Sequence, residues 1–300
     1  MKRILEYKIE PEFDGERLMA VLKRHFKMST VLIKEQRTYA DGFLLNGEHI
    51  RTVDAVHTGD ILTITLHDKA SENISPVNIP IDIVYEDEDI LIVNKSPNMP
   101  THISVGNYEN SLANAVMYHY AQNGEEHLFR AVNRLDADTS GLMTIAKNSY
   151  AHARLADEIQ SGVLTRRYMC IAQGDIEYNG TVNAPIARRT GSAIERCVSD
   201  SGQRAVTHYE VLERYGDYTL LRMTLETGRT HQIRVHMAHI GHPLAGDWLY
   251  GTENHKLVQR QMLHSCYLRL IHPITGKIME WNIKMADDME NFVRKVTQKH

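Results

Sequence analysis

Three segments in the second half of the chain alternate apolar and polar residues with the two-residue period of β-strands. They span residues 164–172, 205–214 and 218–226, and only Tyr215, Gly216 and Asp217 separate the last two. A connection this short joins antiparallel neighbours, because a parallel crossover needs about a dozen residues or more. The pattern therefore indicates strands that follow one another directly, rather than a doubly wound nucleotide-binding fold.

The other periodic segments of this region predict a further hairpin and several helices. The turn sequence Glu-Asp-Glu-Asp predicts a hairpin over residues 81–94. Capping residues and apolar spacing predict helices over residues 111–121, 150–160 and 231–240. No glycine-rich phosphate loop occurs. We therefore expect an α+β fold with a mixed, largely antiparallel sheet.

The first seventy residues carry a separate apolar pattern. The predicted elements are helices over residues 15–25 and 30–39 and strands around residues 44–50 and 60–66. Asn46-Gly47 supplies a hairpin turn between strands. A polar stretch follows, so we expect a small α+β domain over residues 1–72, a linker over residues 73–80 and a larger domain over residues 81–300.

Composition indicates an ordinary soluble protein. Of the 300 residues, 42% are hydrophobic and 24% are charged. The first residues include acids where a signal peptide needs an apolar core, and no window approaches the roughly 18 consecutive apolar residues of a membrane span. Cys170, Cys197 and Cys266 form no Cys-x-x-Cys pair, which disfavours a disulfide framework or a structural zinc site. We expect a monomer in the cytoplasm, with reduced thiols and no membrane partner.

The net charge of −4 argues against a protein that binds nucleic acid through its overall charge. The distribution of arginines qualifies this argument, because a local basic groove can exist on an acidic protein. Six arginines lie in the middle of the chain, at positions Arg166, Arg167, Arg188, Arg189, Arg196 and Arg204. If these segments converge on one face, they form such a groove.

The segment NRLDADTSGL, residues 133–142, sets Asp136 between an arginine and a Thr-Ser-Gly turn. Its pattern predicts a strand end over residues 132–135, a turn over residues 138–141 and an apolar strand over residues 142–146. An aspartate in such a place often only accepts backbone hydrogen bonds. A calcium loop is excluded, because its twelfth position would be Lys147 where a glutamate is required.

This segment resembles the signature HRLD-x-x-TSGL of the RluA-type pseudouridine synthases, which isomerise uridine in RNA without a cofactor. Three further blocks occur in the order of that family: YEDEDILIVNKSPNMPTH, RRYMCIAQG and TGRTHQIRVHMAHIGHPLAGDWLYG. The chain departs from the family at Asn133, where histidine is usual, and at Ser96, which interrupts Asn-Lys-Pro. Asn133 can neither titrate nor provide a cationic phosphate contact.

The resemblance implies three catalytic residues. Asp136 would be the nucleophile, and Arg234 would be its counter-ion, with a guanidinium fork that can pair with the carboxylate in a fixed geometry. Tyr168 would pack against the target base and assist proton removal. No cofactor is implied. RNA contacts are expected within the same blocks, from His102, Arg134, Arg229 and His231.

The first domain resembles the alpha-L RNA-binding domain that precedes many such enzymes. Lys34 and Arg37 are its candidate phosphate contacts. The implied partner is RNA: large-subunit ribosomal RNA first, with transfer RNA as the alternative. A different alternative is a ribosome-associated RNA-binding protein that has lost catalysis.

Four histidines in the last block suggest a metal site as another alternative: His231, His236, His239 and His242. His236 and His239 have helical spacing, but no His-Glu-x-x-His pattern or nearby carboxylate set completes a catalytic zinc site. We therefore expect no metal.

Overall fold

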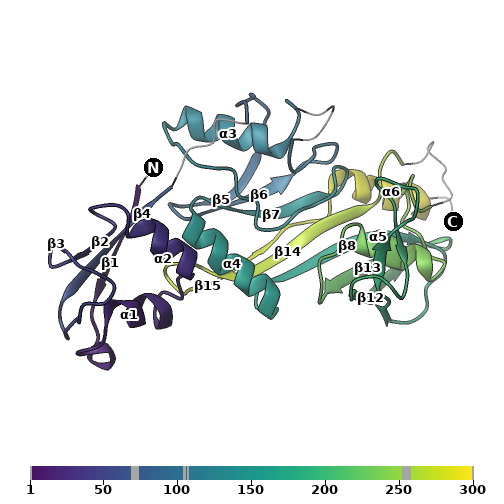
Figure 1. Ribbon diagram of the computed structural model, residues 1–300. Coiled ribbons are helices and arrows are strands. Elements are labelled where there is room, and N and C mark those ends of the chain that lie inside the picture. Colours follow the sequence, from purple (N-terminus) through teal and green to yellow (C-terminus); the bar gives the residue numbers. More distant parts are fainter. Residues whose placement is uncertain (1, 69–73, 104–105, 107, 252–257, 299–300) are drawn as a thin grey trace.

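The computed structural model describes residues 2–68, 74–103, 106, 108–251 and 258–298 (Figure 1). Its first part is a four-stranded sheet in the order β1-β4-β2-β3, and every pair in it is antiparallel. The elements of this part are β1 (Lys2–Lys8), a 3-10 turn (Pro11–Phe13), α1 (Leu18–Arg24), α2 (Thr30–Gln36), β2 (Phe43–Leu45), β3 (Glu48–His49) and β4 (Ile61–His67). Residues from both helices and the sheet form one apolar core.

The second part is built on a nine-stranded sheet in the order β5-β6-β7-β14-β8-β13-β12-β9, with β15 paired to β14. Its strands are β5 (Asp82–Glu86), β6 (Ile90–Lys95), β7 (Ser140–Ala146), β8 (Thr165–Gln173), β9 (Gly180–Asn183), β12 (Val206–Arg214), β13 (Tyr218–Leu225), β14 (Leu263–Ile271) and β15 (Ile278–Asn282). Among the described strands of this sheet, only the β7–β14 pair is parallel. The predicted α+β class with a mixed, largely antiparallel sheet is confirmed.

Helices cover both faces of this sheet, because successive strand residues point to opposite sides. Leu91 and Val93 of β6 pack with α3 and α5, whereas Ile90 and Ile92 pack with α4. Figure 1 shows α3 and α4 on opposite sides of the sheet. The helices of this part are α3 (Leu112–Gln122), α4 (Ser149–Ser161), α5 (Gln232–His239) and α6 (Asp287–Thr297). The face that carries α5 holds the candidate site.

Local signals in the sequence set several of these elements. Ser111 and Asn114 form a capping box at the start of α3, and Gly162 ends α4 in the left-handed conformation. The predicted hairpin over residues 81–94 is present as β5 and β6, with Asp82 opposite Asn94. Each of these features rests on residues close together in the chain.

Two predictions around Asp136 are wrong. Residues 132–135 are not a strand, and the turn runs from Asp136 to Thr139, closed by a hydrogen bond of 3.1 Å from the Thr139 N–H to the Asp136 carbonyl. Ser140 and Gly141 already belong to β7. The reason is that hydrogen bonds from distant segments, such as the one from the Met99 N–H to the Ala137 carbonyl, hold the backbone around Asp136. Local turn preference therefore does not decide the path of this backbone.

The N-terminal sheet lies against the large sheet through specific contacts. Tyr150 of α4 packs into the N-terminal core, and its hydroxyl donates to the Phe26 carbonyl at 2.8 Å. Arg3 of β1 makes a two-point ion pair with Asp89, both bonds 3.0 Å long. The predicted domain end at Glu72 lies outside the described residues, so the boundary stays a prediction. In the described part of the chain, no helix is long and apolar enough to cross a membrane.

Candidate active site

Asp136 lies in a loop whose backbone is held from another segment of the chain. The Thr101 hydroxyl donates to the Leu135 carbonyl at 2.9 Å, and the buried ammonium of Lys95 donates to the Ala137 carbonyl at 2.8 Å. The backbone N–H of Met99 also donates to the Ala137 carbonyl, at 3.1 Å. The backbone carbonyls of both residues next to Asp136 are therefore held, which limits where its carboxylate can point.

Arg234 provides the cation beside this carboxylate. Its Nη1 lies 3.0 Å from Asp136 Oδ2, and its side chain is only 4% exposed whereas that of Asp136 is 26% exposed. The second carboxylate oxygen, Oδ1, lies 3.8 Å from His231 Nε2. One oxygen of Asp136 is thus held by the guanidinium, and the other faces the pocket.

A second carboxylate, Asp247, takes the fork of Arg234. Arg234 Nε and Nη2 donate to the two oxygens of Asp247, each at 2.8 Å, and Asp247 is fully buried. Arg234 is therefore paired with Asp136 through a single hydrogen bond, because the other side of its guanidinium is taken by Asp247. Burial lowers the pKa of Arg234, but the hydrogen bonds and charges of Asp247 and Asp136 outweigh it and raise that pKa.

Sequence reasoning missed Asp247, although it lies in the quoted block GHPLAGDWLYG. The available signal in the sequence was an acid directly after Gly246. In the structure, Gly246 has a φ of +77°, and a Cβ added to it would lie 1.8 Å from the Arg260 carbonyl oxygen. Only glycine allows this backbone approach. The backbone N–H groups of Leu249 and Tyr250 donate to Asp247 Oδ1 at 3.0 and 3.2 Å, so the acid is fixed as well as buried.

Tyr168 lies on β8 and lines the same pocket as Asp136 and Arg234. The tyrosine is buried, and burial raises its pKa, with a smaller raising effect from the Asp136 charge against the lowering effect of Arg166. The side chain is therefore a neutral phenol. Apolar side chains of Leu225, Ile233 and Leu263 complete the wall around it.

His231 begins α5 in the left-handed conformation, with φ of 57°. Its Nδ1 lies 2.8 Å from the Tyr250 hydroxyl, which also accepts a hydrogen bond of 2.8 Å from the Arg196 backbone N–H. The single hydroxyl hydrogen can therefore go to Nδ1, which leaves Nε2–H to face Asp136. Burial lowers the pKa of His231, and this favours the neutral ring.

A groove of about 1180 Å³ leads to this pocket. Four of the predicted RNA contacts line it: His102, Arg134, Arg229 and His231. Lys34 and Arg37 do not, because both are exposed at α2 in the N-terminal part.

The groove also collects part of the mid-chain arginine cluster. Arg166 and Arg204 line it, and Arg204 is paired with Glu226. Arg167 points to the other face of β8, where its guanidinium lies 4.5 Å from the Tyr267 ring centre. Asn133, which stands where the family has histidine, is buried, and its Oδ1 accepts from the Thr144 N–H at 3.1 Å.

The four histidines of the last block do not converge. His236 binds Thr207 and the Ala184 carbonyl, and His242 binds the Gln173 carbonyl. His239 lies exposed near a separate hollow. Among the described residues, the one set with metal-ligand spacing is Asp87, Asp89 and His272, which contains none of these four histidines.

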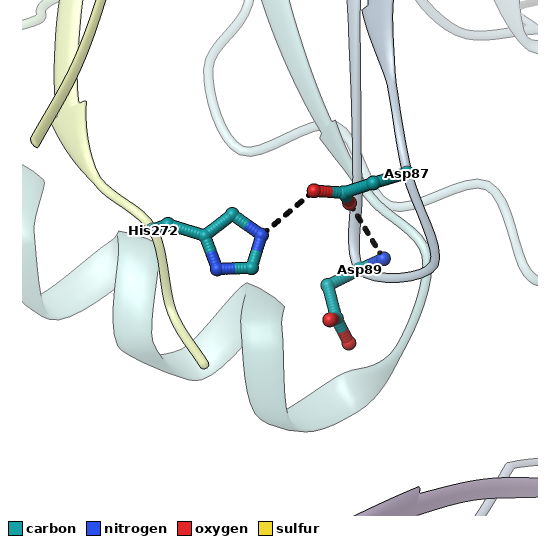
Figure 2. A group of neighbouring side chains, drawn as sticks. All are labelled: Asp87, Asp89 and His272. Carbon is teal, nitrogen blue, oxygen red and sulfur yellow. Dashed lines mark hydrogen bonds and ion pairs between the residues drawn. The ribbon is translucent and has the colours of Figure 1, made fainter. Parts of the chain in front are cut away.

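The side chains of Asp87, Asp89 and His272 are already engaged in hydrogen bonds within the protein (Figure 2). His272 Nδ1 accepts from the backbone N–H groups of Ile274 and Thr275 at 3.2 and 3.0 Å, so the proton of a neutral ring is on Nε2, which donates to Asp87 at 2.8 Å. Both oxygens of Asp89 accept from Arg3. The ring therefore offers no lone pair to a cation between these residues.

Comparisons with known proteins agree with the fold. Residues 89–239 match the RNA pseudouridylate synthase family. The chain is 41% identical over 263 residues to the ribosomal large subunit pseudouridine synthase D of Pasteurella multocida, covering 83% of this chain and 81% of that protein. It is 39% identical over 295 residues to the uncharacterized RNA pseudouridine synthase YhcT of Bacillus subtilis, covering 97% of each.

Solved structures show the same likeness. The human RNA pseudouridylate synthase domain containing 1 protein superimposes with a TM-score of 0.56 at 26% identity, covering 72% of this chain and 94% of that one. The chain therefore belongs to the RNA pseudouridylate synthase enzymes, and among them to the RluA type. The family predicted from the four sequence blocks is confirmed.

Proposed function

We propose that this enzyme converts uridines of large-subunit ribosomal RNA to pseudouridine, with Asp136 as the nucleophile. The observation that carries the proposal is the carboxylate of Asp136 at the floor of a basic groove, held by one nitrogen of a buried arginine. Relatives named as ribosomal large-subunit synthases support the choice of RNA. Monomeric state, cytoplasmic location and RNA contacts by Lys34 and Arg37 belong to the same proposal.

The reaction breaks the bond from ribose carbon 1′ to uracil nitrogen 1 and forms a bond from the same carbon to uracil carbon 5. The proton on carbon 5 leaves, and nitrogen 1 gains one, so nothing is oxidised or reduced. A carboxylate oxygen can hold the sugar or the base covalently while the base turns. Asp136 Oδ1 suits this role, since Arg234 binds the other oxygen.

The site geometry favours a target base that has left its helix. The side chain of Asp136 is 26% exposed and lines both the pocket and the groove, and enzymes that act on a base take it out of the stack to reach it. A flipped uracil can lie against the ring of Tyr168 and the apolar wall. We therefore expect a loop, a bulge or a locally opened helix as the target.

Replacement of Asp136 tests the proposal. Asp136→Asn keeps the size of the side chain and removes its charge, so we expect no measurable turnover while RNA binding persists. The measurement is tritium release from RNA labelled at carbon 5 of uracil, alongside a binding titration. Asp138→Asn, two residues away and outside the pocket lining, is the matched control and should stay within a few-fold of the parent. Turnover of Asp136→Asn within tenfold of the parent would refute the assignment.

A further inference from the structure

A small hairpin beside the active site carries two arginines directly opposite each other. It consists of β10 (Ile186–Arg188) and β11 (Arg196–Val198), and Arg188 is the cross-strand partner of Arg196. Like charges in this position destabilise an antiparallel pair. Within the described part of the chain neither guanidinium meets a carboxylate, and the Arg196 guanidinium donates to the carbonyls of Ile194 and Glu195. Among the described residues, no carboxylate therefore compensates the two like charges.

A third arginine faces the same place. Arg188, Arg196 and Arg229 line a hollow of about 300 Å³ together with Gln203 and Thr230, and none of the described residues that line it is acidic. Arg229 also lines the catalytic pocket and the groove. Thr230 is shared with the groove as well, so the hollow adjoins the route by which RNA would reach Asp136.

The hairpin is held firmly against the site. The Arg196 backbone N–H donates to the Tyr250 hydroxyl, which lies 2.8 Å from His231 Nδ1. Ile186 packs in a small core with Val235 of α5. Beside it, a Cβ on Gly202 would lie 2.5 Å from the Ile186 backbone, so the chain passes closely there. The arginine pair thus occupies a set position relative to Asp136.

We infer that this hollow binds a backbone phosphate of the RNA strand next to the target uridine. This inference rests on the proposed function. A phosphodiester carries one negative charge and oxygens that match the planar fork of a guanidinium. A phosphate bound between Arg188, Arg196 and Arg229 would offset the repulsion among these three positive charges. Because the contact is to the backbone, it positions the strand without reading its sequence.

Arg188→Gln tests the inference, with Arg189→Gln as a matched control. Arg189 is the next residue, but it pairs with Glu195 at 3.3 Å and lines a different hollow. In titrations with the RNA substrate, we expect Arg188→Gln to bind on the order of tenfold more weakly at low salt. The slope of log affinity against log salt should become shallower by about 0.7, the value for one phosphate contact to a single strand. Arg189→Gln should change affinity less than about twofold.

Two further measurements separate binding from structure. Without RNA, the melting temperature of Arg188→Gln should equal or exceed that of the parent, because a like-charge contact is removed. Arg188→Lys keeps the charge and should retain the parent salt slope. An unchanged slope in Arg188→Gln, or equal losses in Arg188→Gln and Arg189→Gln, would overturn the inference even if the parent forms pseudouridine. A parent that binds RNA with this salt dependence but forms no pseudouridine would instead refute the proposed function.

Discussion

At the scale of single residues, the arrangement around Arg234 decides how Asp136 is presented. Asp247 takes the Nε edge of the guanidinium, and only Nη1 reaches Asp136. Asp136, Asp247 and Arg234 together carry one net negative charge. Arg234 is thus already paired with a buried partner, and it fixes the direction of the Asp136 carboxylate rather than neutralising it.

Arg234→Lys should lower the single-turnover rate on the order of 100-fold, because an ammonium cannot keep both partners in place and a displacement of about 1 Å is costly. RNA affinity should change little. Asp247→Asn should also lower the single-turnover rate, because it weakens the hold on the Arg234 guanidinium. Since both changes act through the aim of Asp136, the double variant should be far less than additive. A normal rate at saturating enzyme for Arg234→Lys, or simple additivity, would contradict this account.

At the scale of elements, the parallel pair of β7 and β14 joins the two halves of the large sheet. His264 of β14 is the partner of Ser140 of β7, and its Nδ1 lies 2.9 Å from the Ser140 hydroxyl. The ring is buried, and desolvation followed by the charge of Arg260 lowers its pKa to about 4. This junction directly follows the Asp136 turn, so its stability bears on the site.

The lowered pKa of His264 predicts acid sensitivity of the fold. In the unfolded chain, His264 binds a proton once the pH falls below its ordinary pKa of about 6.5. In the folded chain, it binds that proton only near pH 4. The contribution of His264 to the free energy of unfolding should therefore be fully present above about pH 6.5. The free energy of unfolding should fall by about 3 kcal/mol as the pH drops to 4. Urea unfolding of the parent and His264→Gln at several pH values measures this contribution. If both proteins lose the same stability over that range, the contribution of His264 is absent.

At the scale of the whole molecule, the N-terminal sheet is docked rather than merely tethered. Tyr150 enters its core, and Asp89, whose side chain is 3% exposed, depends on Arg3 for an ion pair. Arg130 binds Asp68 in the same way, at 2.7 Å. These contacts give the N-terminal part a defined position relative to the large sheet.

A chain without residues 1–72 should still fold, because the large sheet has its own cores. Its melting temperature should fall by several degrees, since Asp89 loses a partner and Tyr150 loses its packing. Turnover on a short stem-loop should persist, with weaker preference among longer RNAs. Thermal unfolding and single-turnover rates on both substrates check this. An insoluble or unfolded product would show that the two sheets form one folding unit.

The sequence by itself determined the family, the fold class and the segments that place Asp136, Tyr168 and Arg234. Hairpins such as β5–β6 and β12–β13 were predictable because their turns and periodicity are local. The central position of β14 was not, because its partners β7 and β8 lie about a hundred residues earlier and one of the two pairings is parallel. The edge strand β1 was also missed.

The partners of the site residues depended on the same long-range packing. Arg234 was predictable from its motif, but Asp247 became its second partner only through the close backbone approach at Gly246. Arg188 and Arg196 are ordinary arginines in the sequence, and only the pairing of β10 with β11 sets them face to face. Tertiary structure decided these contacts because charge and hydrogen bonding act through space, whereas a motif records only residue type and spacing.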